Sequence, residues 1–233
     1  MLKKLPAAFK AAFPHTIPVM TGFLFLGIAY GVLMGSKGYD WPWILLISSA
    51  VYAGSLQFVG ISLLSSAFNP LYAFMIALVI NARHLFYGFS MLEKYSNTGK
   101  IKPYLIFGMC DETFSLLHSI EPPPHVEKRL FMLAITMMHQ IYWVLGGVVG
   151  GVIKPLVVFD TRGLDFVMTA FFVAIFIDQW RLKRNRSPAL IGLAVATLSL
   201  FIFGAEGFII PAMALIIICL AMFQKKIAKG ADN

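Results

Sequence analysis

Residues 17–35 read IPVMTGFLFLGIAYGVLMG and contain no charged side chain. The length of this run is close to the roughly 20 apolar residues that an α-helix needs to cross the hydrocarbon core of a bilayer. The whole chain of 233 residues has a similar character, since 59% of its residues are hydrophobic and only 13% are charged. A soluble domain carries about 25% charged residues, which it needs to cover its surface. The composition therefore argues against a soluble enzyme, a nucleic-acid binder and a disordered chain, and it predicts an all-α, polytopic transmembrane helical bundle.

Apolar stretches of this kind divide the chain into about eight predicted helices. They cover residues 17–35, 42–66, 71–92, 103–120, 129–153, 164–181, 188–203 and 207–223. Several are close to the shortest helix that spans a bilayer, so some of them fit half-helices or re-entrant segments as well as full spans. We predict a single membrane domain over 1–233, with the transmembrane bundle over 17–223 and a cytoplasmic tail over 224–233.

The first 16 residues differ from these stretches because they hold three lysines. Leu5, Phe9 and Phe13 recur there at helical spacing, and the lysines fall outside that stripe. The pattern predicts a short interfacial helix over 1–16 that lies on the cytoplasmic face of the membrane. A disordered start is the alternative.

Lysine and arginine residues lie almost entirely in the breaks between the stretches and give the chain a formal charge of +8. If all eight stretches cross and the N-terminus is cytoplasmic, twelve of these residues face the cytoplasm and six face outward. Because cytoplasmic loops are enriched in Lys and Arg, this bias predicts that both termini are cytoplasmic. Lys94, Lys100 and Lys102 count against it, but they move to the cytoplasmic side if one of the first three stretches does not cross fully.

The two cysteines give no sign of a metal site. Cys110 and Cys219 both lie inside apolar stretches, and no metal-ligand spacing accompanies either of them. We therefore expect no disulfide, no metal and no cofactor.

Polar residues near the middle of the apolar stretches are the predicted substrate-binding or coupling residues. An ionisable side chain at the bilayer centre costs about 2.5–3.5 kcal/mol, so it is expected to face water, a partner or a substrate. Four consecutive stretches carry polar or backbone-exposing residues at this depth. They are Gly54, Ser55, Gln57, Asn81, Arg83, His84, Asp111, Glu112 and His139. Asp178 and Gln179, near the end of stretch 164–181, are secondary because Asp178 has Arg181 one turn away as a structural partner.

These residue types suit a zwitterionic substrate. Arg83 carries a permanent positive charge and offers an anion site. Asp111 and Glu112 are two adjacent carboxylates against one arginine, so one acid is in surplus and could bind a cation or carry a proton. A helix interrupted at Gly54–Ser55 would add free backbone groups for a ligand. The alternative is a polar network that only fastens helices together.

Glycines recur at a four-residue spacing in both halves of the chain. Gly27, Gly31 and Gly35 lie in the first half, and Gly147 and Gly151 open the second. A possible duplicated four-helix unit would explain the echo, and transporters are often built from such repeats; chance similarity is the alternative. The spacing itself permits close helix contact and favours packing over substrate binding.

Four motifs in order resemble the AzlC family. They are Ala53–Phe58, Asn81–Gly88, Asp111–Phe114 and the stretch from Asp165 to Trp180, and the resemblance runs from about Phe13 to Phe223. It implies the large subunit of an exporter of branched-chain amino acids (valine, leucine and isoleucine, with methionine as a further candidate) in a bacterial cytoplasmic (inner) membrane. It also implies a small membrane subunit of the AzlD type as the partner.

The sequence and the resemblance together predict a secondary transporter and not an enzyme. The proton gradient or the membrane potential is the expected driving force. One alternative is a non-transporting subunit that scaffolds a partner in the membrane. Another is an intramembrane serine hydrolase, in which Ser62 of Gly60-Ile61-Ser62-Leu63 would be the nucleophile and His84 or His139 the base.

Overall fold

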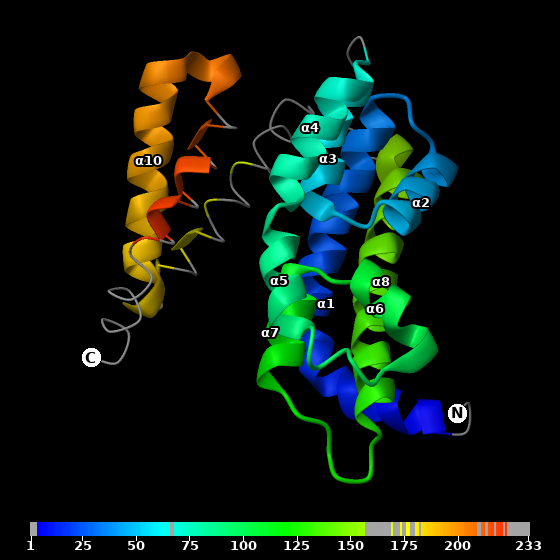
Figure 1. Cartoon of the computed structure of the whole chain (residues 1–233). Helices are drawn as coiled ribbons and strands as arrows, with labels where there is room; N and C mark the ends of the chain where they lie inside the picture. The colour runs from blue at the N-terminus through cyan, green and yellow to red at the C-terminus, as the bar shows by residue number, and fades with distance from the viewer. Residues whose placement is uncertain are drawn as a thin grey trace. The chain divides into compact units, whose positions relative to one another are not determined.

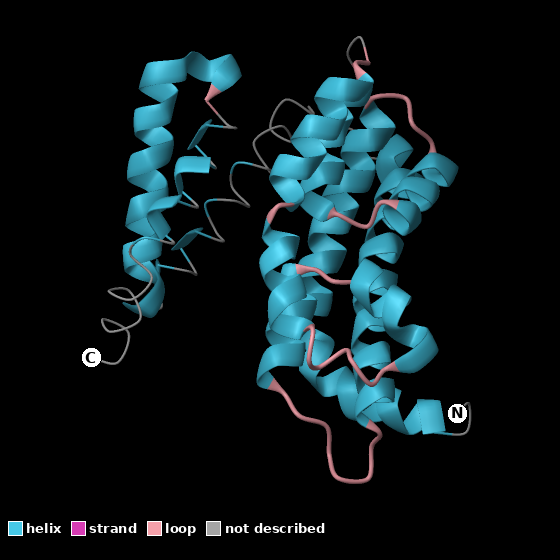
Figure 2. Cartoon of the chain, viewed as in Figure 1, coloured by secondary structure: helices cyan, strands magenta, loops and turns pink. Residues whose placement is uncertain are grey.

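The computed structural model describes residues 4–65, 68–156 and 183–208, together with scattered positions between 169 and 222. Within this part of the chain every regular element is a helix, which confirms the predicted all-α class (Figure 1). Figure 2 shows these helices joined by loops and turns. By its internal contacts the chain divides into two compact units, Met1–Thr161 and Arg162–Asn233.

Two long helices form the centre of the first unit. α1 covers Leu5–Ser36 and α8 covers Lys128–Ile153. Both are long and apolar enough to cross a membrane. The predicted stretches 17–35 and 129–153 lie within them.

The start of α1 differs from the prediction. Residues 5–16 are the first turns of one continuous helix and do not form a separate one. Ala8, Ala12 and Thr16 are buried here, whereas Phe13 is 47% exposed. Small residues at four-residue spacing let the helix lie close to its neighbour, so they replace the larger apolar stripe as the packed face.

α1 and α8 lie side by side and run in the same direction (Figure 1). Near the start of α1, the Thr16 hydroxyl is 3.0 Å from the hydroxyl of Tyr142. Further along, a Cβ placed on Gly27 would lie 2.9 Å from the backbone nitrogen of Gly147, and one on Gly31 would overlap the Gly147 carbonyl oxygen. The predicted glycine pattern therefore serves packing, because only glycine lets these two backbones come so close.

Stretch 42–66 is a hairpin of two short helices. α2 covers Trp41–Ala50 and α3 covers Gly54–Leu64. The hydroxyl of Tyr39, which lies just before α2, donates to the Leu64 carbonyl at the end of α3, at 3.3 Å. α3 therefore returns to the end of the bundle where α2 begins, so the stretch forms a hairpin and not one continuous helix. We call it the first hairpin.

Stretch 71–92 forms a helix pair that runs the length of the unit. α4 covers Pro70–Asn81 and α5 covers Arg83–Met91, separated only by Ala82. Ala82 has helical φ and ψ of −55° and −30°, so the two helices continue each other. Asn69 caps the start, where its side-chain oxygen accepts the N–H groups of Leu71 and Tyr72 at 3.1 Å each.

Stretch 103–120 is again a hairpin. After a short 3₁₀ turn, η2 (Gly99–Ile101), come α6 (Lys102–Phe107) and α7 (Asp111–Ser119). Lys94, in the turn after α5, donates to the Leu117 carbonyl near the end of α7 at 2.6 Å. We call this stretch the second hairpin.

A salt-bridge cluster shows which end of the bundle the second hairpin enters from. Glu121, between α7 and α8, lies 3.4 Å from the Lys94 ammonium and 2.8 Å from that of Lys128 at the start of α8. The hydrogen bond from Lys128 is the main reason why the pKa of Glu121 is lowered. The turn after α5, the end of α7 and the start of α8 therefore lie together, so the two hairpins enter from opposite ends.

The second unit is described mainly by α10, Lys183–Gly207, which contains the predicted stretch 188–203. Its segment Arg186–Gly204 is long and apolar enough to span a membrane. Gly204 breaks the helix with a φ of +71°, which glycine adopts without strain. Most of the predicted stretch 164–181 and a smaller part of 207–223 lie outside the described residues, and so do Asp178 and Gln179.

Candidate functional site

The tips of the two hairpins meet beside the middle of α8. The hydroxyl of Tyr52, at the first tip, is 4.0 Å from the sulfur of Cys110 at the second tip. At the end of the second tip, the Thr113 hydroxyl is 2.8 Å from Nδ1 of His139 on α8. We call the two tips, residues 51–54 and 108–113, the hairpin junction. It places interrupted backbone from two directions at one level of the bundle, which is how many transporters build a substrate site.

The first tip is locally strained. Tyr52 has a φ of +41°, the only positive value at a non-glycine residue in the described part of the chain. The left-handed region disfavours residues with a Cβ, and such outliers cluster at functional sites. Two residues further on, a Cβ at Gly54 would lie 3.2 Å from the ring of Trp143, so the glycine leaves room for that ring against the tip.

Side chains satisfy much of the backbone that the helix breaks set free. Gln140 of α8 donates to the Ser49 carbonyl in the last turn of α2 at 3.2 Å and accepts from the Tyr104 hydroxyl at 2.6 Å. At the second tip, the sulfur of Cys110 accepts the N–H of Thr113 at 3.5 Å and so caps α7. A helix end buried without such partners would be costly, above all in lipid.

His84 links the α4–α5 pair to the second tip. Its Nδ1 lies 3.1 Å from the carbonyl oxygen of Asn81, and its Nε2 lies 3.1 Å from that of Met109. Both partners can only accept, whereas a neutral imidazole has one N–H to donate. The ring of His84 thus bridges the end of α4 and the second tip, with the N–H of a neutral ring donated to one of the two carbonyls.

Asp111 and Glu112 occupy the first turn of α7. The Tyr87 hydroxyl of α5 donates to Oδ1 of Asp111 at 2.9 Å. Carboxylates are favoured at a helix N-terminus by the helix dipole, so this placement also lowers the cost of the two charges. Arg83 is the first residue of α5, but its side chain lies outside the described residues, so its pairing with Asp111 stays a prediction.

Two of the predicted residues are built into helix packing. Gln57 is 3% exposed, donates to the Ser48 hydroxyl at 3.2 Å and accepts from the Trp143 indole at 2.9 Å. His139 is fully buried beside Thr113. Both fit the polar fastening network that the sequence left open as an alternative. Ser55 is buried next to Gly54 in the first turn of α3.

The structure adds residues that the sequence-based set lacks. Tyr52, Tyr87, Cys110 and Thr113 make the contacts that join the two tips to α5 and α8. A tyrosine or threonine in an apolar stretch carries no charge and costs little to bury when it is hydrogen-bonded, so hydropathy does not single it out.

The arrangement needed for a serine hydrolase is not formed by the described residues. Ser62 is exposed on α3. The ring nitrogens of His84 face two backbone carbonyls, and Nδ1 of His139 faces Thr113. Neither imidazole has a hydrogen bond to Ser62, which a nucleophile and its base require.

Comparison with known proteins agrees with the resemblance. A family model described as AzlC protein matches residues 18–157. A Bacillus subtilis protein named "Branched-chain amino acid transport protein AzlC" is 49% identical over 96% of this chain and 88% of its own length. A Haemophilus influenzae membrane protein is 40% identical over 97% and 93%, and the Escherichia coli inner membrane protein YgaZ is 23% identical over 84% and 83%. No solved structure matches the chain. The chain is therefore a member of the AzlC family.

Proposed function

We propose that this chain is the membrane transport subunit that exports branched-chain amino acids, namely valine, leucine and isoleucine, with methionine as a further candidate. The observation that supports it best is the meeting of two oppositely entering hairpins at a polar junction beside the middle of α8. The printed name of the Bacillus subtilis relative supports the substrate class.

The hairpin arrangement favours transport over a purely structural role. A re-entrant hairpin leaves only half of the membrane thickness between its tip and the solution on its own side. With hairpins from both sides, a small movement of either tip opens the junction to one side while the other tip keeps it closed. The described hydrogen bond between the tips is the 4.0 Å contact between the Tyr52 hydroxyl and the Cys110 sulfur, a weak bond that a small movement can break.

The same hairpin arrangement strengthens the prediction of how the chain is oriented in the membrane. Up to residue 156 and leaving out Arg83, the eight-span arrangement puts five Lys or Arg residues on each side. If the two hairpins are re-entrant, Lys94, Lys100 and Lys102 join the side of the N-terminus, and the ratio becomes eight to two. By the positive-inside rule the N-terminus is then cytoplasmic, in the inner membrane of a bacterium.

Cysteine labelling tests this orientation. In a chain whose Cys110 and Cys219 are replaced by serine, we expect Lys37→Cys to react with a membrane-impermeant maleimide in intact cells. Asn97→Cys is expected to react only after the cells are permeabilised, because the turn after α5 lies on the cytoplasmic side. The eight-span arrangement requires both positions to react in intact cells. Both positions are exposed, so accessibility within the protein does not decide the result.

Reconstitution tests the function itself. Purified chain in vesicles, alone and with its AzlD-type subunit, is expected to release labelled valine under a pH gradient or a membrane potential at least tenfold faster than empty vesicles. Labelled aspartate is the matched control and should stay inside, because its side chain is charged. If the chain alone releases no valine while the partner alone and the two together do, the chain is a scaffold and the proposal is wrong.

A further inference from the structure

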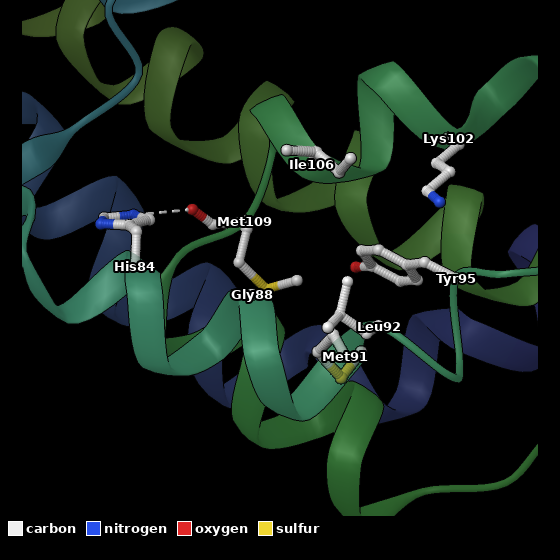
Figure 3. Close-up of a pocket in the computed structure, with 8 residues that line it drawn as sticks. All are labelled: His84, Gly88, Met91, Leu92, Tyr95, Lys102, Ile106 and Met109. Carbon is white, nitrogen blue, oxygen red and sulfur yellow. Dashed lines mark hydrogen bonds between the residues drawn. The ribbon is translucent and has the colours of Figure 1, made fainter.

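A cavity of about 150 Å³ lies between α5 and the second hairpin and reaches Met109 of the hairpin junction (Figure 3). His84 and Met109 belong both to its lining and to the contact between α5 and the second tip. The residues that line it include His84, Gly88, Leu92, Tyr95, Lys102 and Ile106.

Most of the cavity wall is apolar. Met91, Leu92, Ile106 and Met109 supply aliphatic and thioether surface. Gly88 contributes no side chain, and nothing lies within 4 Å of the position that its Cβ would take, so the space is left by the glycine. An engineered apolar cavity of about this volume in another protein takes up benzene. The cavity thus has room for a branched aliphatic group of four to six heavy atoms.

One side of the cavity is polar and lacks a partner. The hydroxyl of Tyr95 is buried, has no hydrogen-bond partner, and points into the cavity in Figure 3. The ammonium group of Lys102 comes from α6 above the same ring and has no ion pair among the described residues. A buried hydroxyl without a partner is costly, and a cation in an apolar wall attracts an anion. The two groups together are suited to a carboxylate.

We propose that this cavity binds the carboxylate and the branched side chain of the amino acid that the chain transports, with the carboxylate at Lys102 and Tyr95. The proposal rests on the proposed function and assigns it a site. None of the eight lining residues is acidic, so the cavity holds no counter-charge for the substrate ammonium. It follows that the 2-oxo acid of the same carbon skeleton binds about as well as the amino acid, whereas an amine without a carboxylate does not.

Competition on the unmodified full chain tests the ligand class. Purified protein in lipid nanodiscs is incubated with labelled leucine, and unlabelled leucine, 4-methyl-2-oxopentanoate or 3-methylbutylamine is added. We expect the first two to displace the label at concentrations within about fivefold of each other. The amine is expected to need at least a hundredfold more. Displacement by the amine as readily as by leucine would overturn the assignment of the carboxylate to the cavity.

Matched variants test whether the cavity is the binding site. Lys102→Met keeps the length of the side chain but removes its charge, and Lys100→Met makes the same change at an exposed neighbour outside the cavity. Gly88→Leu fills the cavity, and Gly22→Leu adds the same side chain on α1 where nothing lies within 4 Å. Lys102→Met and Gly88→Leu should each raise the Kd for leucine about tenfold or more, and the two controls should leave it within twofold.

The outcomes separate this proposal from the function. If the wild type binds leucine and both cavity variants bind it equally well, the cavity is not the site although the chain still transports branched-chain amino acids. If the wild type neither binds leucine nor releases valine from vesicles, both the proposed function and the proposed site are wrong.

Discussion

A leucine in place of Gly31 is expected to prevent α1 and α8 from packing. A Cβ at this position would overlap the carbonyl oxygen of Gly147 and would lie 2.7 Å from the nitrogen of Gly151 and 2.9 Å from the Cα of Gly150. All three are backbone atoms, which cannot rotate away as a side chain would. Overpacking of a core commonly costs about 1–3 kcal/mol, and we expect about 3 kcal/mol or more here because the helices must separate.

The matched control is Gly22→Leu, a glycine of the same helix that is exposed and has nothing within 4 Å of its Cβ position. Thermal unfolding of the purified proteins, followed by size-exclusion chromatography after heating, compares the two. We expect Gly31→Leu to lower the midpoint by on the order of 10 °C or to yield no monodisperse protein, and Gly22→Leu to change it by about 2 °C at most. Equal midpoints for the two variants would show that the contact of Gly27 and Gly31 with Gly147 and Gly151, which we call the glycine seam, does not hold the first unit together.

The glycine seam is a part of the fold that the sequence predicts well. Glycines at four-residue spacing on two apolar helices form a face without side chains, and this local pattern needs no tertiary information. The positions of most of the apolar stretches are likewise predictable, because each helix must carry its own apolar residues. The sequence does not show that α1 and α8 are the two helices that pair, since 91 residues separate the end of one from the start of the other.

The hairpins could not be predicted in the same way. Stretch 42–66 has 25 residues without a charge, which is the length and composition of a full span. Its turn is held by tertiary contacts, such as the hydrogen bond from Gln140 to the Ser49 carbonyl. In stretch 103–120 the sequence does carry a local signal for the start of a new helix. Asp111 and Glu112 follow Gly108 and stand in the first turn of α7, where acids are typical of a helix start.

The candidate site is partly predictable for the same reason. Depth along an apolar stretch is a local property, and three residues that it picks out, Gly54, His84 and Asp111, lie at the two tips or against them. Tyr95 and Lys102 belong to the cavity but not to the predicted set, because an eight-span arrangement puts both in an outer loop. Only the return of the second hairpin makes them neighbours of His84.

Asp111→Asn is expected to abolish the dependence of valine release on a pH gradient. Asparagine keeps a side-chain oxygen that accepts the 2.9 Å hydrogen bond from Tyr87, so the contact between α5 and α7 and insertion into the membrane should persist. It removes the one charge at this position that a proton can neutralise. In vesicles we expect at least a tenfold loss of the stimulation that an imposed pH gradient produces, with binding of leucine to the purified chain unchanged within about threefold.

Tyr87→Phe is the control that separates charge from geometry. It removes the hydrogen bond that Asp111→Asn keeps, and it leaves the carboxylate of Asp111 in place. If coupling depends on the charge of Asp111, this variant still responds to the gradient, although more slowly. A response lost in Tyr87→Phe but kept in Asp111→Asn would assign the effect to the hydrogen bond.

Glu112→Gln completes the set, since the two acids are adjacent in the first turn of α7. An unchanged pH response in both acid variants would remove the carboxylates from coupling.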